Sequence, residues 1–478
     1  MVKIHMICSK IKSQYISILI LLLLSLLFTN LIYAEQNNMT YNPYVKTNIP
    51  DVTTDMLFPS FWINLIKDPD KLIGDENDIK AYNNKNIKNC PPIVNLENYP
   101  ETFTKEQLIK LITNISRPSQ NNRYDSYGQL VGISYYKELE KNLNLESLND
   151  INSVSYGIVV RRSELRTYPI YDKLYSSPDS EFDRFMETAV YIAEPIIILS
   201  ESRDKKWFFA QMYNYLAWIP ASDTAITSKT NWNNYVKISD FLVITGNDVY
   251  TNYNPINKKV SNIKLDMGVK IPLASGDEIP DDINGQSTSG NYAVKLPTRD
   301  DSGNLEIQLA LIPIICDVHI GYLPYTQRNI INQAFKLLGE RYSWGGSFYG
   351  RDCTAFTMDI FRTMGIKLPR NSSEQGKLAA GIYYDMTVAI TYEERAKLID
   401  NISPGTALYM NGHALLYIGR YDKNYYAIHD FAGFILKENN TAKYYSVLEV
   451  AVTPLNILTS SGKTFLEALY GARFFSLK

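Results

Sequence analysis

Histidine and cysteine are scarce in this chain, with four of each among 478 residues. Basic residues are not in excess either, because 48 Lys and Arg stand against 50 Asp and Glu. This balance argues against a nucleic-acid partner, which would need a strongly basic surface. Beyond one apolar run near the N-terminus there is no second long apolar stretch, so we expect no further membrane contact. Because histidine and cysteine are so few, any catalytic or metal-binding chemistry that uses them must depend on a small number of positions.

The N-terminus has the features of a secretory signal peptide. Three lysines in the first 12 residues precede an apolar run over 16–28, and Ala34 offers a cleavage point. We expect residues 1–34 to be a signal peptide that directs export to the periplasm, the cell envelope or the extracellular space. Ile32, at the −3 position of this cleavage site, is larger than the small residue usual there, so an uncleaved membrane anchor is the alternative interpretation.

Three cysteines remain after the signal segment, an odd number for an oxidising compartment. Cys90 and Cys316 could form a disulfide, although sequence alone does not establish it. Cys353 is then the unpaired thiol, as a nucleophile must be.

The chain is long enough for three or four domains. Residues 35–150 are polar and predict a small, mainly helical or irregular segment, with one clear helix from Thr104 or Lys105 to Ile115. Residues 153–225 and 230–323 each contain short β-type runs separated by polar turns, which predicts two small barrels. Residues 326–478 predict an α+β domain, with helices first and antiparallel strands after them.

The expected elements can be given by range. In the first barrel we expect strands over 155–160, 189–192, 195–199, 207–212 and 215–219. In the second we expect strands over 241–245, 248–251, 269–272, 292–295 and 307–312. In the last domain we expect strands over 407–410, 413–418, 425–429, 445–452 and 468–475, the final two as a pair. Asn411-Gly412 predicts a tight hairpin.

Cys353 is placed at the start of a predicted helix over 353–364, with Asp352 as its N-cap. A thiol in the first turn of a helix faces the positive end of the helix dipole, which favours the nucleophilic thiolate. His413 and His429 lie downstream in strand-like segments. A cysteine with a distant histidine and a third polar residue is the pattern of a cysteine hydrolase.

The second predicted hairpin places the two histidines near each other. If residues 419–424 form its loop, residue 418 faces 425 and His413 faces about 430, so His429 lies within one step of register. Diagonal neighbours on adjacent strands lie about 7–8 Å apart. We expect His413 to be the general base and His429 to orient it.

Other interpretations of these residues stay open. Cys353, His413 and His429 could hold zinc, but they lack closely spaced ligand pairs, and we expect no metal or cofactor. Asp352 is either a helix cap or a site for a cationic substrate group. His319 has no such neighbours and is interpreted as structural. Gly345 and Gly346 would let the backbone approach a substrate or a facing strand.

Several short motifs occur together between residues 326 and 435: Tyr342-x-Trp344-Gly-Gly, Asp352-Cys353-Thr354, Leu368-Pro-Arg370-Asn-Ser, Pro404-Gly405, Gly412-His413, Tyr417-Ile-Gly419 and His429. Together they resemble the NlpC/P60 family of papain-like cysteine peptidases. That family usually has Ser-Gly after the cysteine, where this chain has Thr354-Ala355. The hydroxyl is kept, but the additional methyl narrows the site.

Motifs further upstream extend the resemblance: Arg161-Arg162-x-x-Leu165-Arg166, Phe182-Asp183-Arg184, Glu194-Pro195, Trp207 and Trp218. They are similar to the multidomain subgroup with a stabilising N-terminal segment (35–150) and two bacterial SH3 domains (153–225 and 230–323) before the peptidase domain (326–478). The resemblance implies a γ-D-glutamyl–diamino acid endopeptidase acting on peptidoglycan stem peptides with a free N-terminal L-Ala.

The resemblance also implies roles for individual residues. Cys353, His413 and His429 form the catalytic triad, in a groove bounded by the first SH3 domain. Asp352 binds the substrate amine with help from Thr354, Tyr342 lies near the oxyanion hole, and Trp344 joins the substrate-binding set. Two other function classes stay open: a non-catalytic wall-binding protein and an acyltransferase on the same fold. The sequence leaves the oligomeric state undetermined.

Overall fold

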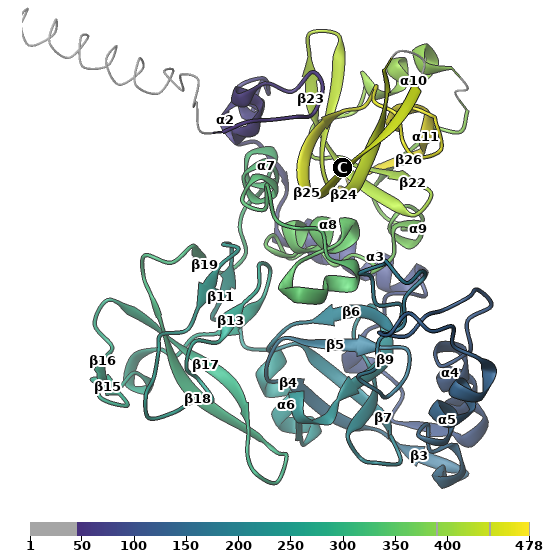
Figure 1. Cartoon of the computed structure of the whole chain (residues 1–478). Coiled ribbons are helices and arrows are strands. Elements are labelled where there is room, and N and C mark those ends of the chain that lie inside the picture. Colours follow the sequence, from purple (N-terminus) through teal and green to yellow (C-terminus); the bar gives the residue numbers. More distant parts are fainter. Residues whose placement is uncertain (1–44, 389–390, 439–440, 478) are drawn as a thin grey trace, which may run out of the picture.

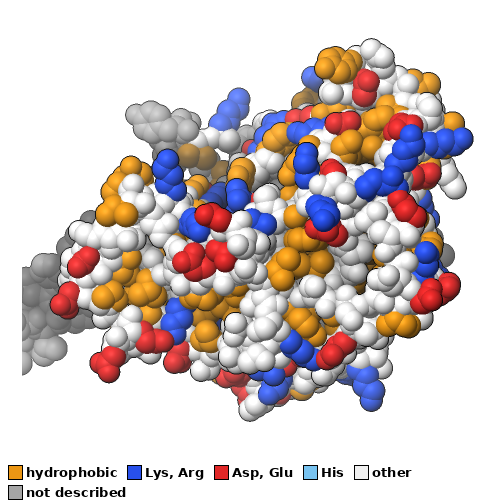
Figure 2. All heavy atoms as spheres, turned by 90° about the horizontal axis from the view of Figure 1, so that it is seen from below, with side chains coloured by type: hydrophobic (Ala, Val, Ile, Leu, Met, Phe, Trp, Pro, Cys, Tyr) orange, Lys and Arg blue, Asp and Glu red, His pale blue; other side chains and the backbone are white. Residues whose placement is uncertain are grey.

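A computed structural model describes residues 45–388, 391–438 and 441–477 of the chain (Figure 1). The predicted signal peptide lies outside these residues. Within the described ranges, no helix combines the length and the apolar character that a bilayer crossing requires. Figure 2 shows acidic and basic side chains interspersed over the face seen from below, with apolar groups between them.

The N-terminal part is mainly helical. Its principal elements are α2 (Pro59–Ile63), β1 (Leu72–Gly74), α3 (Glu76–Asn89), β2 (Thr102–Thr104), α4 (Lys105–Ile115), α5 (Ile133–Lys141) and β3 (Ile151–Ser153). The helix predicted from Thr104 or Lys105 to Ile115 is confirmed as α4, which starts at Lys105, and Thr104 caps it by accepting a hydrogen bond from the Gln107 N–H. Trp62 is fully buried and packs against Tyr426, with ring centroids 5.1 Å apart. This contact joins the N-terminal part to β24 (Asn424–Glu438) of the C-terminal part.

The first β-rich part is a seven-stranded sheet in the order β10-β4-β7-β8-β9-β5-β6. Its strands are β4 (Ser155–Val159), β5 (Ser163–Arg166), β6 (Met186–Val190), β7 (Pro195–Glu201), β8 (Trp207–Gln211), β9 (Leu216–Pro220) and β10 (Thr224–Thr227). The sequence missed β5 and β10. In β5 the buried residue Arg166 is charged and pairs with Asp183 at 2.9 Å, so a search for apolar alternation does not find it.

The second β-rich part consists of several short sheets. It contains β11 (Phe241–Ile244), β12 (Val249–Tyr250), β13 (Lys264–Leu265), β14 (Lys270–Pro272), β15 (Asp282–Ile283), β16 (Gln286–Ser287), β17 (Asn291–Arg299), β18 (Leu305–Pro313) and β19 (Val318–Ile320), and α6 (Lys229–Val236) precedes it. Each of the five strands expected here overlaps an observed strand. The assignment of this part as a second SH3 domain stays a prediction.

The C-terminal part places helices before an antiparallel sheet. Its principal elements are β20 (Tyr325–Thr326), α7 (Gln327–Phe335), α8 (Cys353–Arg362), α9 (Ser372–Gln375), β21 (Ile382–Asp385), α10 (Tyr392–Ile399), β22 (Ala407–Met410), β23 (His413–Tyr421), β24 (Asn424–Glu438), β25 (Thr441–Pro454), α11 (Phe465–Ala468) and β26 (Leu469–Phe474). The sheet order is β21-β26-β22-β23-β24-β25. The expected pairing of 445–452 with 468–475 is wrong, because β25 pairs with β24 while β26 lies between β21 and β22.

Helix α8 lies where the C-terminal sheet meets the two β-rich parts (Figure 1). Just before it, the Arg351 guanidinium is 0% exposed and bonds to Asp359 at 2.7 Å, to Glu340 at 2.6 Å and to Asn247 at 2.8 Å. Asp359 also accepts a hydrogen bond from Tyr191 of the first β-rich part. Burial raises the pKa of Asp359 to about 6, against the opposing effect of Arg351. One buried charge therefore joins three parts of the chain next to Cys353.

Replacing Arg351 by Met should destabilise the protein strongly. The variant would leave the Asp359 and Glu340 carboxylates without their buried partner, a loss of about 3–5 kcal/mol in the free energy of unfolding. The matched control is Arg328→Met, which removes an ion pair with Asp70 in which the side chains are 40% and 69% exposed. The control should cost at most about 1 kcal/mol. Urea unfolding measures both, and similar losses would contradict a central role for Arg351.

Candidate active site

Cys353 is the first residue of α8, and the loop before it determines where the thiol lies. In that loop Gly345 and Gly346 have φ of 65° and 85°, which glycine adopts readily. A Cβ at these positions would lie 2.7 Å from Met186 and 2.7 Å from Ala189. The loop therefore packs directly on β6, and of the two expectations for these glycines, the structure supports approach to a facing strand.

His413 and His429 meet on adjacent strands. His413 Nε2 lies 2.7 Å from His429 Nδ1, which confirms that the two rings are close. The predicted register is slightly wrong, because β23 continues to Tyr421, which pairs with Asn424 across a two-residue turn. The loop was expected to be longer than it is, and a bulge between Tyr417 and Gly419 was not expected. These two differences shift the strand pairing in opposite directions, so the predicted register is off by only one residue at His413. Continuing the ladder makes His413 and His429 diagonal neighbours.

Thr453 extends this pair into a chain of hydrogen bonds. His429 Nε2 lies 2.8 Å from Thr453 Oγ1, and both side chains are fully buried. The sequence did not point to Thr453, because a single threonine at the end of a strand carries no distinctive signal. Since His413 Nε2 is engaged by His429, Nδ1 is the ring nitrogen of His413 left for another partner.

The thiol and the imidazole are both neutral groups in this structure. Burial, and next the Asp352 carboxylate, raise the pKa of Cys353 to about 12, while the Ala414 N–H beside the thiol acts in the opposite direction. Burial also lowers the pKa of His413 to about 4. Burial and the neighbouring carboxylate thus oppose the thiolate-favouring effect expected of the helix start, which stays a prediction.

The Asp352 carboxylate is fully engaged within the protein. Its Oδ1 accepts hydrogen bonds from the Ala355 N–H and the Thr354 hydroxyl, both at 3.0 Å. Its Oδ2 accepts from the Gly345 N–H at 3.1 Å and from Arg370 at 2.5 Å. A carboxylate has about four lone-pair sites, and here four donors occupy them. Burial alone would raise the pKa of Asp352, but Arg370 and these donors hold it below its usual value.

Arg370 is a site residue whose role the sequence did not reveal. Its guanidinium is buried and donates to Thr354 at 2.6 Å and to Thr188 of β6 at 2.7 Å, besides pairing with Asp352. It thereby joins the start of α8 to the first β-rich part.

Tyr342 and Trp344 form one wall of the site together with residues of the first β-rich part. Burial and the neighbouring Cys353 raise the pKa of Tyr342 above its ordinary value, so the phenol stays protonated. Phe182 contacts Tyr342 edge-on, with ring centroids 5.6 Å apart. Trp344 is 36% exposed, and the Arg184 guanidinium lies 4.3 Å from the centroid of its ring. The side chains that the sequence grouped around Cys353 therefore share one region.

Among the residues that the structure describes, the other histidine and the other two cysteines lie apart from this region. His319 is in β19, with its Nδ1 3.1 Å from the Gly321 carbonyl oxygen. Cys90 and Cys316 are both free thiols, so the disulfide considered for them is not formed. Two imidazole nitrogens on one tetrahedral zinc ion would lie about 3.3 Å apart. The 2.7 Å contact between His413 and His429 is instead a hydrogen bond, which does not favour the zinc alternative.

Asp430 is an unexpected buried acid beside the site. It is 0% exposed, and neither carboxyl oxygen has a hydrogen-bond partner among the described residues. Burial, and next the charge of Asp352, raise its pKa to about 9, so it is protonated at neutral pH. Its own charge, once formed, would oppose ionisation of Cys353.

Asp430→Asn should change how stability depends on pH. The folded-state pKa of Asp430 is raised, so its stabilising effect is fully present below the unfolded-state pKa and is lost as pH rises toward 9. Stability of the variant relative to the parent should rise with pH by up to about 1.4 kcal/mol per unit between pH 4 and 9. Urea unfolding at several pH values measures this slope. A change in the free energy of unfolding that the amide causes equally at every pH does not affect the slope. Exposed Asp301→Asn is the control, and equal slopes for both variants would contradict the assignment.

Two segments of the chain match known protein families. Residues 339–446 match the NlpC/P60 family, and residues 169–220 match an SH3 domain of the SH3b1 type. A γ-D-glutamyl-L-lysine dipeptidyl-peptidase of Bacillus subtilis (strain 168) is 33% identical over 98 residues, which is 19% of this chain and 32% of that protein. The match thus spans about a third of the length of this curated relative.

Two solved structures are also similar. An NlpC/P60 endopeptidase from Photobacterium damselae subsp. piscicida has a TM-score of 0.70 and 20% identity, covering 87% of this chain and 97% of its own, which shows a shared fold. An NlpC/P60 family protein from Bacillus cereus ATCC 10987 has a TM-score of 0.43 and 19% identity, covering 61% of this chain and 83% of its own. The chain therefore carries an NlpC/P60 domain and, ahead of it, an SH3 domain of the SH3b1 type.

Proposed function

We propose that the protein is an exported peptidoglycan hydrolase of the cysteine endopeptidase type. It cleaves the γ-D-glutamyl–diamino acid bond of stem peptides through Cys353, His413 and His429. The observation that carries the proposal is the hydrogen-bonded chain His413–His429–Thr453 beside the helix-terminal Cys353, inside the NlpC/P60 domain. The Bacillus subtilis relative, a γ-D-glutamyl-L-lysine dipeptidyl-peptidase, supports the γ-D-glutamyl bond as the target.

The hydrogen-bond chain determines which tautomers the reaction needs. For His413 Nδ1 to accept the thiol proton, its Nε2–H must donate to His429 Nδ1. His429 then carries its proton on Nε2 and donates it to Thr453 Oγ1. In this arrangement His429 and Thr453 fix the orientation of His413 and take no proton themselves.

The reaction proceeds in two steps. The sulfur of Cys353 attacks the γ-carbonyl carbon of D-Glu while His413 takes the thiol proton, and His413 then protonates the departing amine. Water next attacks the thioester with His413 as the base, which releases the γ-carboxylic acid and restores the thiol. Because thiol and imidazole start as neutral groups, proton transfer accompanies attack. Backbone N–H groups at the start of α8, with Tyr342 alongside, stabilise the oxyanion.

The proposed substrate carries a free N-terminal L-Ala. The wall formed by Phe182, Arg184 and Trp344 limits the space on the side of the first β-rich part. Asp352 is the adjacent anion, but its four lone-pair sites are occupied. A substrate ammonium can bind there only by replacing a donor, and the Thr354 hydroxyl is the donor that rotates away most easily.

The other function classes predict different behaviour. A wall-binding protein without catalysis has no use for two histidines aligned by a buried threonine. An acyltransferase would use the same thioester but pass the acyl group to an acceptor other than water. Export rests on the N-terminal segment and is part of the proposal.

The proposal predicts that a defined peptide, L-Ala-γ-D-Glu-diamino acid, yields L-Ala-D-Glu and the free diamino acid, identified by mass. Cys353→Ala should give no product, because no other group supplies the nucleophile. His413→Ala should be about 10²–10⁴-fold slower, and His429→Gln less impaired, because it only orients the base. His319→Gln is the matched histidine control and should be unaffected.

The outcomes separate the alternatives. Turnover by Cys353→Ala equal to that of the parent would end the cysteine-peptidase proposal. A transferred acyl group in place of the free acid would favour the acyltransferase. Greater impairment of the His429 variant than of the His413 variant would indicate that His429 is the base and that His413 orients it.

Acetylating the substrate amine should slow cleavage by the parent by about 10–100-fold, the effect of losing one hydrogen bond to a charged group. The same peptide with N-methyl-L-Ala adds bulk but keeps the positive charge, and it should be cleaved nearly as fast as the unmodified peptide. The measurement is kcat/KM for the three peptides. Undiminished cleavage of the acetylated peptide would show that the amine is not recognised and that Asp352 acts only as a helix cap.

A further inference from the structure

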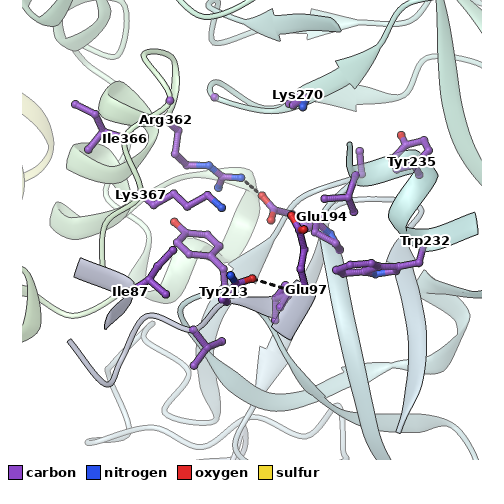
Figure 3. Close-up of a pocket in the computed structure, with 18 of the residues that line it drawn as sticks. Ile87, Glu97, Glu194, Tyr213, Trp232, Tyr235, Lys270, Arg362, Ile366 and Lys367 are labelled. Carbon is purple, nitrogen blue, oxygen red and sulfur yellow. Dashed lines mark hydrogen bonds and ion pairs between the residues drawn. The ribbon is translucent and has the colours of Figure 1, made fainter. Parts of the chain in front are cut away.

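A cavity of about 300 Å³ lies where the four parts of the chain meet, away from the candidate active site (Figure 3). Its wall includes Ile87 of the N-terminal part, Glu194 of the first β-rich part, Lys270 of the second and Lys367 of the C-terminal part. Arg362, the last residue of α8, also lines it, whereas Cys353 is the first residue of that helix. The length of α8 therefore separates the two sites by about 15 Å.

The charges around this cavity are not balanced. Arg362 pairs with Glu194, and Glu97 at the rim pairs with Lys237 at 3.1 Å. In the described part of the chain, Lys270 and Lys367 form no ion pair. Glu97 attracts the Lys367 ammonium as well, but it is shared with Lys237, so positive charge remains in excess around the cavity.

Each of these ammonium groups lies near an aromatic ring, Lys270 half-buried and Lys367 exposed. Lys270 Nζ lies 4.3 Å from the ring centroid of Phe241, and Lys367 Nζ lies 5.8 Å from that of Tyr213. Lys270 is half-buried in β14, and burial together with the charge of Lys367 lowers its pKa. The two lysines therefore repel one another across the cavity, and an anion between them would remove that repulsion.

We propose that this cavity binds a small organic dianion, a phosphate monoester or a dicarboxylate, between Lys270 and Lys367. Two ammonium groups favour two negative charges over one. The volume is at the lower end for ligand sites, and such sites commonly occur at interfaces between domains. A phosphate or carboxylate pair fills only part of it, which leaves room for an organic group beside Ile87 and Ile366.

Binding has a structural consequence. The ligand would contact Lys270 of the second β-rich part and Lys367 of the C-terminal part at once, and so link two parts of the chain. A ligand that binds only the folded protein raises its unfolding temperature.

The test uses the full chain at mildly alkaline pH, where inorganic phosphate is mainly a dianion. The probes are inorganic phosphate and succinate, with acetate at matched ionic strength as the monoanion. We expect at least one dianion to raise the Tm of the parent well above the effect of acetate. Lys270→Gln and Lys367→Gln should each weaken binding about tenfold or more, measured by calorimetry, and the double variant should show no dianion-specific shift.

Lys377→Gln is the matched control, because Lys377 is exposed and does not line the cavity. It should retain the parent's response. A shift with phosphate alone identifies a phosphate monoester as the ligand class, and a shift with succinate alone identifies a dicarboxylate. No shift with either, a shift no larger than that of acetate, or equal shifts in the parent and the double variant would overturn the proposal.

Discussion

The buried Arg351 guanidinium is the interaction on which the rest of the structure depends. A charge removed from water is tolerated only when its partners are held in place, and those partners come from different parts of the chain. Asp359 belongs to α8, Asn247 to the second β-rich part, and Tyr191 reaches Asp359 from the first. Arg351 lies two residues before Cys353, so the position of the nucleophile is coupled to the assembly of all three parts.

The electrostatics of the site follow from the same burial. Burial raises the pKa of the Cys353 thiol and lowers that of the His413 imidazole, so both groups favour their neutral forms. Arg370 neutralises the one formal negative charge beside the thiol, that of Asp352, and Asp430 stays protonated. The unliganded site thus holds little net charge, and the charges of the reaction arise only when substrate is present.

The sequence predicted local features well and long-range partners poorly. The helix cap at Asp352 and the Asn411-Gly412 hairpin were found, because each depends on a few adjacent residues. The proximity of His413 and His429 was also found, since strand alternation restricts register even when the loop is misjudged. The partners of β25 and β26 were not, because an apolar strand pairs equally well with several others.

Residues that act through burial escaped prediction for a related reason. Thr453, Arg370 and Asp430 are ordinary polar residues in the sequence, and their significance comes from what surrounds them in space. Strand β5 was missed for a similar reason, since one of its two buried residues is a paired arginine. Recognising them requires knowing which segments pack together.

The pair Gly345 and Gly346 has a consequence for how the chain could be divided. Their backbone is pressed against Met186 and Ala189, and Arg162 donates to the carbonyl oxygens of Gly346 and Gly350. The loop that precedes the nucleophile is thus shaped by a neighbouring part of the chain as much as by its own sequence. The NlpC/P60 domain of this chain is consequently not an interchangeable module. If it were grafted onto another protein, it would lose the contact with Met186 and Ala189 that shapes its site.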